Sequence, residues 1–194
     1  MWNIPLNELC KAIGYNELNN MPRMPDLSNL LNEDADIERE KNLQFKKVFL
    51  DEIFYMVIEI KPLLNEAMEY LYNQETGNVA TEAEQKAANE SKTLVNMVCN
   101  LFRLEKEGAN FPTLKVDAAI HAAVIMDKMR NFTANDYYDF RHAQAAVPYC
   151  DYFFTEKNLK YLLTINSLAF DKEYNCEIAS APKDVQRALE GVGA

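Results

Sequence analysis

Three titratable side chains share one stripe of a helix that the sequence predicts late in the chain. Asp136 and Asp139 are three residues apart, so their carboxylates lie on one helix face, and His142 follows three residues later. Carboxylate oxygens are the ligands that Mg²⁺ and Mn²⁺ prefer. A metal ion held in this way can activate a water molecule and stabilise charge on a transferring phosphoryl group. Asp139 is therefore a candidate metal ligand, with Asp136 and His142 as groups that support it.

A polar pair follows a short aromatic strand a little further along the chain. The run 152–154 is Tyr-Phe-Phe, which favours β structure, and Thr155 and Glu156 come directly after it. The carboxyl end of a strand beside an acid-bearing helix is a recurrent ligand site in α/β proteins. Because one carboxylate holds a hard dication poorly, the site needs acids from more than one element. We expect Glu156 to share the ion with Asp139, and Thr155 to shape its water shell.

The elements that position these residues form a strand, a helix and a second strand. A helical pattern over 157–168 separates the strand 152–154 from a second β-favouring run at 176–178. This order predicts a parallel strand pair joined by a crossover helix. Most of the remaining pattern is helical. The expected fold class is therefore mainly α, with a small parallel β element near the C-terminus.

The N-terminal half predicts a long helical hairpin. After an arm over residues 1–33, apolar residues recur at helical spacing over 34–73. Pro62 should kink or split this helix, because proline removes one backbone donor and clashes with the preceding turn. A Thr-x-x-Glu pattern at Thr81 predicts a capping box that opens a second long helix over 81–106. The two helices can pair as an α-hairpin.

These patterns divide the chain after its arm into a helical scaffold, 34–130, and a C-terminal portion, 131–194. The scaffold ends with an alanine-rich helix over 113–129, which suits close packing. Thr133 and Asp136 predict a capping box at the start of the acid-bearing helix. The length of 194 residues suits one compact domain overall.

The charge balance limits the classes of partner. Thirty acidic residues against twenty basic ones give a formal net charge of -10. Such a surface repels phosphate backbones, which argues against general binding of duplex DNA. No window of the sequence approaches the length of a membrane span, and no basic region precedes an apolar run at the start. We therefore expect no membrane association and a cytoplasmic location.

The segment DFRHAQAAVPYCDYFFTEKNLKYLL, residues 139–163, resembles the C-terminal part of PIN-like nucleases. These proteins pair a helix-borne Asp with a strand that ends in an apolar-Thr-acid pattern. On this match Asp139 corresponds to the third metal-binding acid of the family, sixteen residues before Thr155, which corresponds to the strand-end Thr. Glu156 approximates the fourth acidic position. Through residue 180, the resemblance covers about a quarter of the chain.

This resemblance implies an α/β fold with a parallel sheet and a metal-dependent endoribonuclease. PIN-like proteins cut single-stranded RNA with Mg²⁺ or Mn²⁺. They often serve as toxins of toxin–antitoxin or defence systems, each held by an inhibitory protein partner. The resemblance thus implies a hydrolase acting on phosphodiester bonds, with single-stranded RNA as substrate.

Two features of the sequence depart from the family pattern. Lys157 stands two residues after the Thr, where the family usually has an acid or Asn. The family also opens with a strand ending in Asp, and here one candidate is the run 47–51, which would make Asp51 a metal ligand. The helical spacing around Asp51 favours a helix over this strand. On that interpretation the chain resembles only the C-terminal portion of a PIN-like protein, truncated or inactive by itself.

Two other functions remain open. Asp117 and His121 are four residues apart, while Asp139 and His142 are three apart, so two helices could build a di-metal site in a helical bundle. Alternatively, the chain is a non-catalytic helical module that binds another protein. The helical hairpin then offers an apolar stripe, and the open edge of a small sheet invites homodimer formation.

Overall fold

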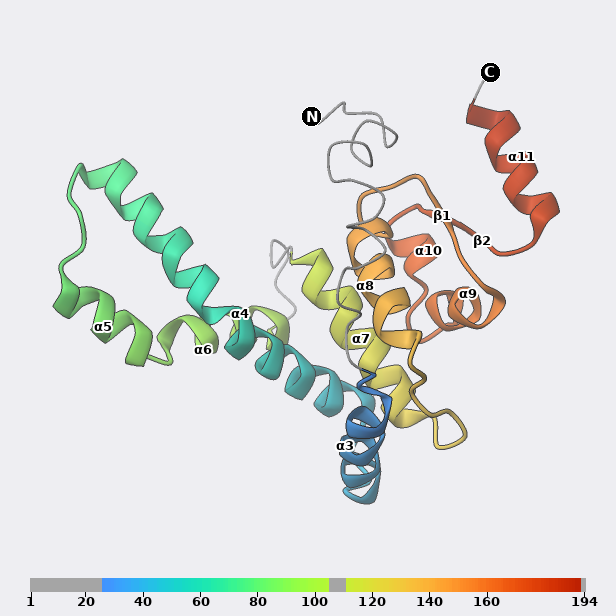
Figure 1. Ribbon diagram of the computed structural model, residues 1–194, viewed down its shortest axis with the longest axis horizontal. Coiled ribbons are helices and arrows are strands. Elements are labelled where there is room, and N and C mark those ends of the chain that lie inside the picture. Colours follow the sequence, from blue (N-terminus) through green and yellow to red (C-terminus); the bar gives the residue numbers. More distant parts are fainter. Residues whose placement is uncertain (1–25, 105–110, 193–194) are drawn as a thin grey trace, which may run out of the picture.

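The computed structural model describes residues 26–104 and 111–192. Within these residues the chain is mostly helical, with one two-stranded parallel sheet near the C-terminus (Figure 1). The predicted fold class is therefore confirmed. Most of the arm predicted over 1–33 lies outside the described residues, and its last residues belong to the first described helix.

Two helices replace the single helix predicted over 34–73. They are α3 (Ser28–Glu40) and α4 (Phe45–Thr76). The prediction of one continuous helix was wrong because Asn42 adopts a φ of 48°, a left-handed conformation that ends a helix and that Asn tolerates. Pro62 does not split α4, which continues to Gly77, where a φ of 71° forms the C-cap.

The second arm of the predicted hairpin is also broken. It consists of α5 (Glu82–Glu90) and α6 (Thr93–Arg103), separated by an extended backbone at Ser91. The capping box predicted at Thr81 is confirmed: its side chain accepts from the backbone N–H of Glu84, and its own N–H donates to the Glu84 carboxylate at 2.8 Å. Both helices pack against α4, so the long helical hairpin is present (Figure 1).

The C-terminal half surrounds a strand pair. The elements in chain order are α7 (Pro112–Met126), α8 (Asp136–Ala146), β1 (Tyr152–Phe154), α9 (Lys157–Thr164), α10 (Phe170–Glu173), β2 (Glu177–Ala179) and α11 (Pro182–Val192).

The two strands pair in parallel, with Phe153 opposite Ile178. The ladder extends one residue beyond β1, because the N–H of Thr155 donates to the carbonyl of Ala179 at 2.9 Å. The predicted crossover is thus confirmed, with the second strand one residue later than expected.

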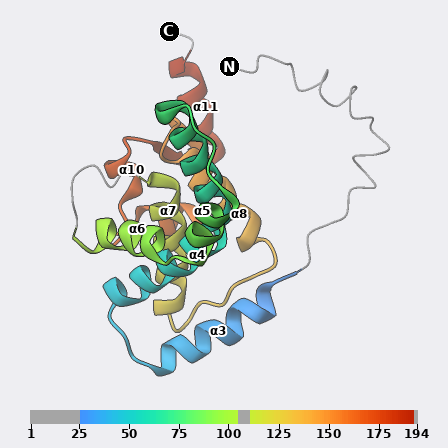
Figure 2. The same cartoon turned by 90° about the vertical axis from the view of Figure 1, so that its left-hand side faces the viewer.

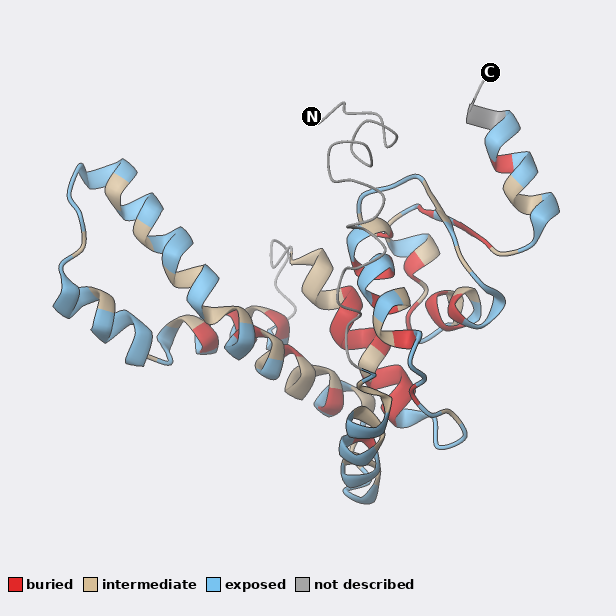
Figure 3. Ribbon diagram, in the orientation of Figure 1, coloured by how far each residue is buried: buried red, intermediate tan, exposed pale blue. Residues whose placement is uncertain are grey.

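The central helix is α7, which is buried on nearly every side from Val116 to Ile125 (Figure 3). A helix that is apolar all round needs neighbours all round. Its alanines allow α4 and α8 to approach closely. One core cluster joins α7 to α3, α8, α9 and β2, and a second joins it to the first half of α4 and to α6.

Helix α3 lies across one end of the molecule and clamps the loop that follows α7 (Figure 2). The Arg39 guanidinium donates to the carbonyls of Val124, Ile125 and Asp127 at 2.9–3.1 Å, and to the carbonyl of Arg130. The last carbonyls of a helix have no partner within the helix, so a cationic donor there satisfies them and favours the helix dipole.

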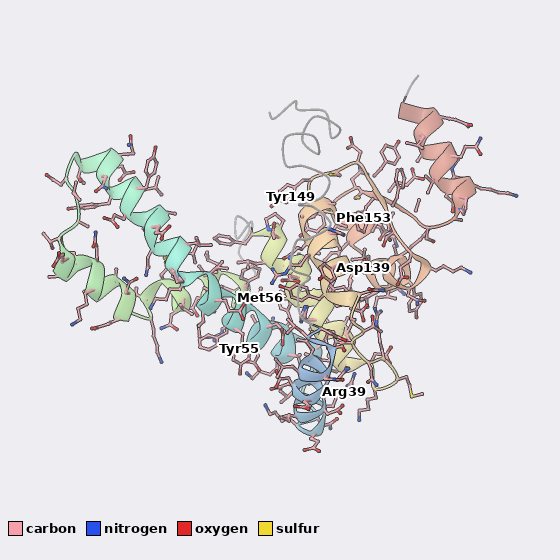
Figure 4. The ribbon with its side chains drawn as sticks, viewed as in Figure 1. Arg39, Tyr55, Met56, Asp139, Tyr149 and Phe153 are labelled. Atoms are coloured by element: carbon pink, nitrogen blue, oxygen red, sulfur yellow. The ribbon has the colours of Figure 1, made fainter. Side chains whose placement is uncertain are left out.

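A second side chain of α3 completes this clamp. The Asn32 amide donates to the carbonyl of Phe132 at 2.9 Å and accepts from the N–H of the same residue at 2.7 Å. Together Asn32 and Arg39 fix the loop between α7 and α8 at both of its ends. Figure 4 marks Arg39 at the foot of the molecule in this view.

We predict that Arg39→Met lowers the free energy of unfolding by about 3 kcal/mol, because several partly buried carbonyls lose their charged donor. Urea unfolding followed by circular dichroism measures this loss. Arg103→Met serves as the matched control, since Arg103 is exposed and its hydrogen bond within the described residues goes to Asn100 on its own helix. Equal effects of the two substitutions would contradict the clamp.

Candidate functional site

The first turn of α8 and the residues after β1 meet in one cleft, which we call the strand-end cleft. Asp136 and Glu156, twenty residues apart in sequence, both line it. Its volume is about 710 Å³. Its other polar lining residues include Arg130, Asn131, Thr133, Asn135 and Asn158.

Asp136 is held firmly at the start of α8. One carboxylate oxygen accepts from Arg130 at 3.1 Å, and the other accepts from the backbone N–H of Thr133 at 2.7 Å. The second bond is one that the predicted capping box would contain, but the box itself is not formed: α8 begins at Asp136 with Asn135 as its N-cap, and no side chain caps that end. With both oxygens engaged and the side chain 8% exposed, Asp136 serves to orient its surroundings rather than as an open ligand.

Asp139 lies one turn further along α8, in the middle of the view in Figure 4. It is half-buried, and its carboxylate forms no hydrogen bond to any described residue. Burial raises the pKa of Asp139, and the charge of Asp136 raises it further, against a lowering by His142. Asp139 is not among the lining residues of the strand-end cleft, and His142 is exposed.

Thr155 and Glu156 occupy the step that the sequence predicts. Thr155 adds one hydrogen bond to the ladder beyond β1, and Glu156 is the N-cap of α9. The Glu156 side chain is exposed, so its carboxylate is open to solvent at the cleft. The start of α8 and the end of β1 therefore both line the strand-end cleft. The acid of α8 that lines it is Asp136 and not Asp139.

Asp51 is not a strand-end acid. The run 47–51 belongs to α4 and is helical, so the strand that would carry Asp51 is absent there. The Asp51 carboxylate forms an ion pair with Lys47 one turn earlier. The helix favoured by the spacing is confirmed.

The carboxylates of Asp139 and Glu156 and the hydroxyl of Thr155 are the types of ligand that suit a Mg²⁺ ion, which keeps several waters and takes phosphate oxygens from a substrate. They do not make a closed protein site. Between residues 26 and 104 and between 111 and 192, no group of three or more His, Cys, Asp or Glu side chains could hold a metal ion.

A second polar cluster lies in a cleft between α4, α7 and α8, which we call the acid–histidine cleft. His121 stands between two carboxylates: its Nδ1 is 3.7 Å from Glu52, and its Nε2 is 3.8 Å from Asp117. Arg141 approaches Asp117 at 3.7 Å. In the amide orientation that satisfies both neighbours, Gln144 donates to Asp117 and accepts from Arg141, each at 3.1 Å.

Burial controls the protonation of this cluster. It raises the pKa of Glu52 to about 7, with a further contribution from the charge of Asp117. It also raises the pKa of Asp117 to about 6, although Arg141 opposes the shift. The pKa of His121 falls to about 4 because of burial and the charge of Arg141, so the imidazole is neutral near pH 7. The buried acids therefore receive no positive charge from His121.

The cleft around this cluster measures about 680 Å³ and has aromatic walls that include Tyr55, Tyr137 and Tyr149. Figure 4 marks Tyr55 with its neighbour Met56 on α4 and, higher in the same view, Tyr149. The Arg141 guanidinium lies 5.2 Å from the centre of the Tyr137 ring, a cation–π contact.

The contacts of Asp117 and His121 bear on the di-metal hypothesis. Their partners among the described residues are Glu52, Arg141 and Gln144, and include neither Asp139 nor His142. The two ring nitrogens of His121 face different carboxylates, so these groups do not converge on one point.

Sequence reasoning missed Glu52 and Arg141 as parts of a cluster. One signal for Glu52 was present: it falls on the stripe of Phe45, Val48 and Phe49, whose apolar residues pack into the core. A carboxylate on a buried helical stripe needs an explanation, because burial of an unpaired charge is costly. No comparable local signal marks Arg141, because its partner is on another helix.

Comparison of the chain with models of known protein families, with curated proteins and with solved structures gives no match. The resemblance to PIN-like nucleases thus stays a hypothesis from residues 139–163. None of the described helices combines the length and the apolar character needed to cross a membrane.

We predict that Glu52→Gln stabilises the protein at high pH only. The folded protein keeps the Glu52 proton between pH 4.5, the ordinary pKa, and about 7, whereas the unfolded chain has lost it. Stability therefore falls as pH rises through this window. Glu52→Gln removes the cost of ionisation and should raise the free energy of unfolding by about 2 kcal/mol at pH 8.

At pH 4.5 the same substitution should change stability little. Urea unfolding at both pH values makes the comparison, with Glu33→Gln as an exposed control on α3. A gain for Glu52→Gln that is the same at both pH values would argue against a raised pKa.

Proposed function

We propose that this chain carries a PIN-like ribonuclease site at the strand-end cleft and hydrolyses single-stranded RNA with Mg²⁺ or Mn²⁺. One observation supports this most: Asp136 and Glu156, from a helix start and a strand end, line the same cleft. That meeting of elements is what the resemblance over residues 139–163 requires.

In this proposal Asp139 and Glu156 are the carboxylates that hold the ion: Glu156 lines the strand-end cleft, and Asp139 would reach the ion from one turn beyond Asp136, the acid of α8 that lines the cleft. Asp139 is free of other hydrogen bonds within the described residues, and Glu156 is exposed at the cleft. The bound ion would stabilise charge on the phosphodiester and make a water molecule more acidic. Asp136 orients the first turn of α8 through Arg130, the Thr155 hydroxyl shapes the water shell, and His142 lies on the same stripe.

The ion needs further ligands, because these two carboxylates are fewer than PIN-like proteins use. Substrate phosphate and water provide some of them. Asp127 also lines the cleft, but its carboxylate accepts from the backbone N–H of Met129 at 3.0 Å, so a further acid would come from outside the described residues. If it does not come from this chain, the chain is a truncated or inactive portion of a PIN-like nuclease, which is the second form of the proposal.

The resemblance also suggests the setting in which the protein acts. An inhibitory protein partner would hold it, as in toxin–antitoxin or defence systems, in the cytoplasm. The two-stranded sheet has unpaired edges within the described residues, which suits a homodimer. The net charge of -10 favours a substrate gathered locally at a metal over broad contact with duplex DNA.

We predict that the chain cleaves a labelled single-stranded RNA with Mn²⁺, and that this cleavage stops when EDTA removes the ion. Asp139→Asn and Glu156→Gln should each reduce the rate by at least about 100-fold, because the remaining acid holds the ion poorly. Asp184→Asn, a partly buried acid in the first turn of α11 that does not line the cleft, is the matched control and should leave the rate unchanged.

Thermal unfolding separates the two forms of this proposal. A rise of the midpoint with Mn²⁺ that Asp139→Asn abolishes, without RNA cleavage, would identify an incomplete site. The absence of both RNA cleavage and a rise of the thermal midpoint with Mn²⁺ would overturn the proposal. Cleavage that persists in both variants would place the activity elsewhere.

A further inference from the structure

The outer half of the helical hairpin is built without a core. Within residues 58–90, which we call the distal arm, no residue is buried, whereas the first half of α4 buries Val48, Ile53 and Val57 (Figure 3). Figure 1 shows this arm extending away from the remaining helices. Helices in proteins owe most of their stability to packing of an apolar face, so an arm without a core needs a cover.

The inner side of the distal arm is already occupied by α5. Asn65 donates to Asn89 at 2.6 Å, and Glu69 accepts from Gln85 at 2.6 Å. These contacts fix which face of α4 points toward α5.

The opposite face of α4 is apolar, and no described residue of another element covers it. Leu63, Ala67, Tyr70 and Leu71 are spaced at i, i+4, i+7 and i+8, and helical geometry places them about 180° from Asn65 and Glu69. Leu63 exposes 65% of its surface, Tyr70 63% and Leu71 52%. We call these four residues the apolar stripe.

The acids that flank the apolar stripe on α4 are Glu66 and Glu75, one at each side of it by helical geometry. Glu69, Glu82 and Glu84 lie on the side of α4 that faces α5 or on α5 itself. From Pro62 to Gln85 the sequence contains no Lys, Arg or His. The nearest cation on α4, Lys61, is bound to the carbonyl of Asn89.

We propose that the apolar stripe is a docking surface for a basic amphipathic helix of another protein. A partner helix with apolar residues at the same spacing would cover the stripe, and its flanking Lys and Arg would face the glutamates. This function is independent of the strand-end cleft.

The charge pattern selects this occupant over two others. A second copy of the chain would bring its own Glu66 and Glu75 against the same two acids, which disfavours self-association. A membrane surface attracts amphipathic helices with Lys and Arg on the polar face, the reverse of the pattern here.

A pair of synthetic peptides tests the chemistry of this surface. The probe is an 18-residue helical peptide with Leu along one face and Lys elsewhere, and its match carries Glu in place of every Lys. The full chain should bind the Lys peptide at least about 10-fold more tightly in fluorescence anisotropy. Raising salt from 50 to 300 mM should weaken that binding.

Variants of the chain then locate the contact. The double substitution Leu63→Ser with Tyr70→Ser removes apolar surface without changing charge, and should weaken binding at least about 10-fold. Leu189→Ser on α11 is the control, because Leu189 is also exposed and lies away from the arm. Since all three residues are exposed, urea midpoints should stay unchanged, which separates lost docking from lost folding.

Several results would overturn this proposal. Equal affinity for the two peptides, no binding of the Lys peptide, or binding that survives the double substitution would each exclude the docking surface. A dimer in light scattering that the double substitution dissociates would show a second copy on the stripe. Partition onto anionic vesicles that the same substitution abolishes would show a membrane surface instead.

Discussion

The contacts of one guanidinium determine how helix α3 meets the end of α7. Arg39 provides donors for carbonyls at the end of α7 and for the carbonyl of Arg130. Without these donors the last turn of a central, fully packed helix would leave buried acceptors unsatisfied. The loop that Arg39 holds carries Arg130, and Arg130 binds Asp136. The geometry of the strand-end cleft thus depends on a residue of α3, almost one hundred positions earlier.

The two polar clefts have opposite electrostatic character. In the strand-end cleft the buried acid, Asp136, is paired with Arg130, and the open acid, Glu156, faces solvent. In the acid–histidine cleft Asp117 is buried and Glu52 is partly buried beside a neutral imidazole, and burial raises the pKa of both acids. The first cleft therefore keeps one carboxylate open to solvent, whereas protons partly neutralise the second.

Local patterns predicted the elements well and their breaks poorly. Helical spacing, the Thr81 capping box and the aromatic run before Thr155 were sufficient to predict the hairpin and the parallel strand pair. The breaks at Asn42 and Ser91 were missed because both residues are tolerated within helices, and only the surrounding packing decides their backbone conformation.

The candidate site was only partly accessible to such reasoning. The bond between Asp136 and Thr133 spans three residues and was predicted from spacing. The hydrogen bonds of Arg39 to α7 join segments that are distant in the sequence, and so does the contact of His121 with Glu52. No sequence periodicity relates such segments. For the same reason spacing put Asp136 and Asp139 on one face but could not tell which of them reaches the strand end.

The central claim is that a divalent cation binds where α8 meets the end of β1. A substoichiometric Mn²⁺ titration of the ¹⁵N-labelled chain tests it directly, because paramagnetic broadening falls steeply with distance. We expect the amide signals of Asn135, Asp139 and Glu156 to broaden first, while those near Glu52 and Asp117 stay sharp. Broadening confined to the acid–histidine cleft, or spread evenly over the acidic surface, would contradict it.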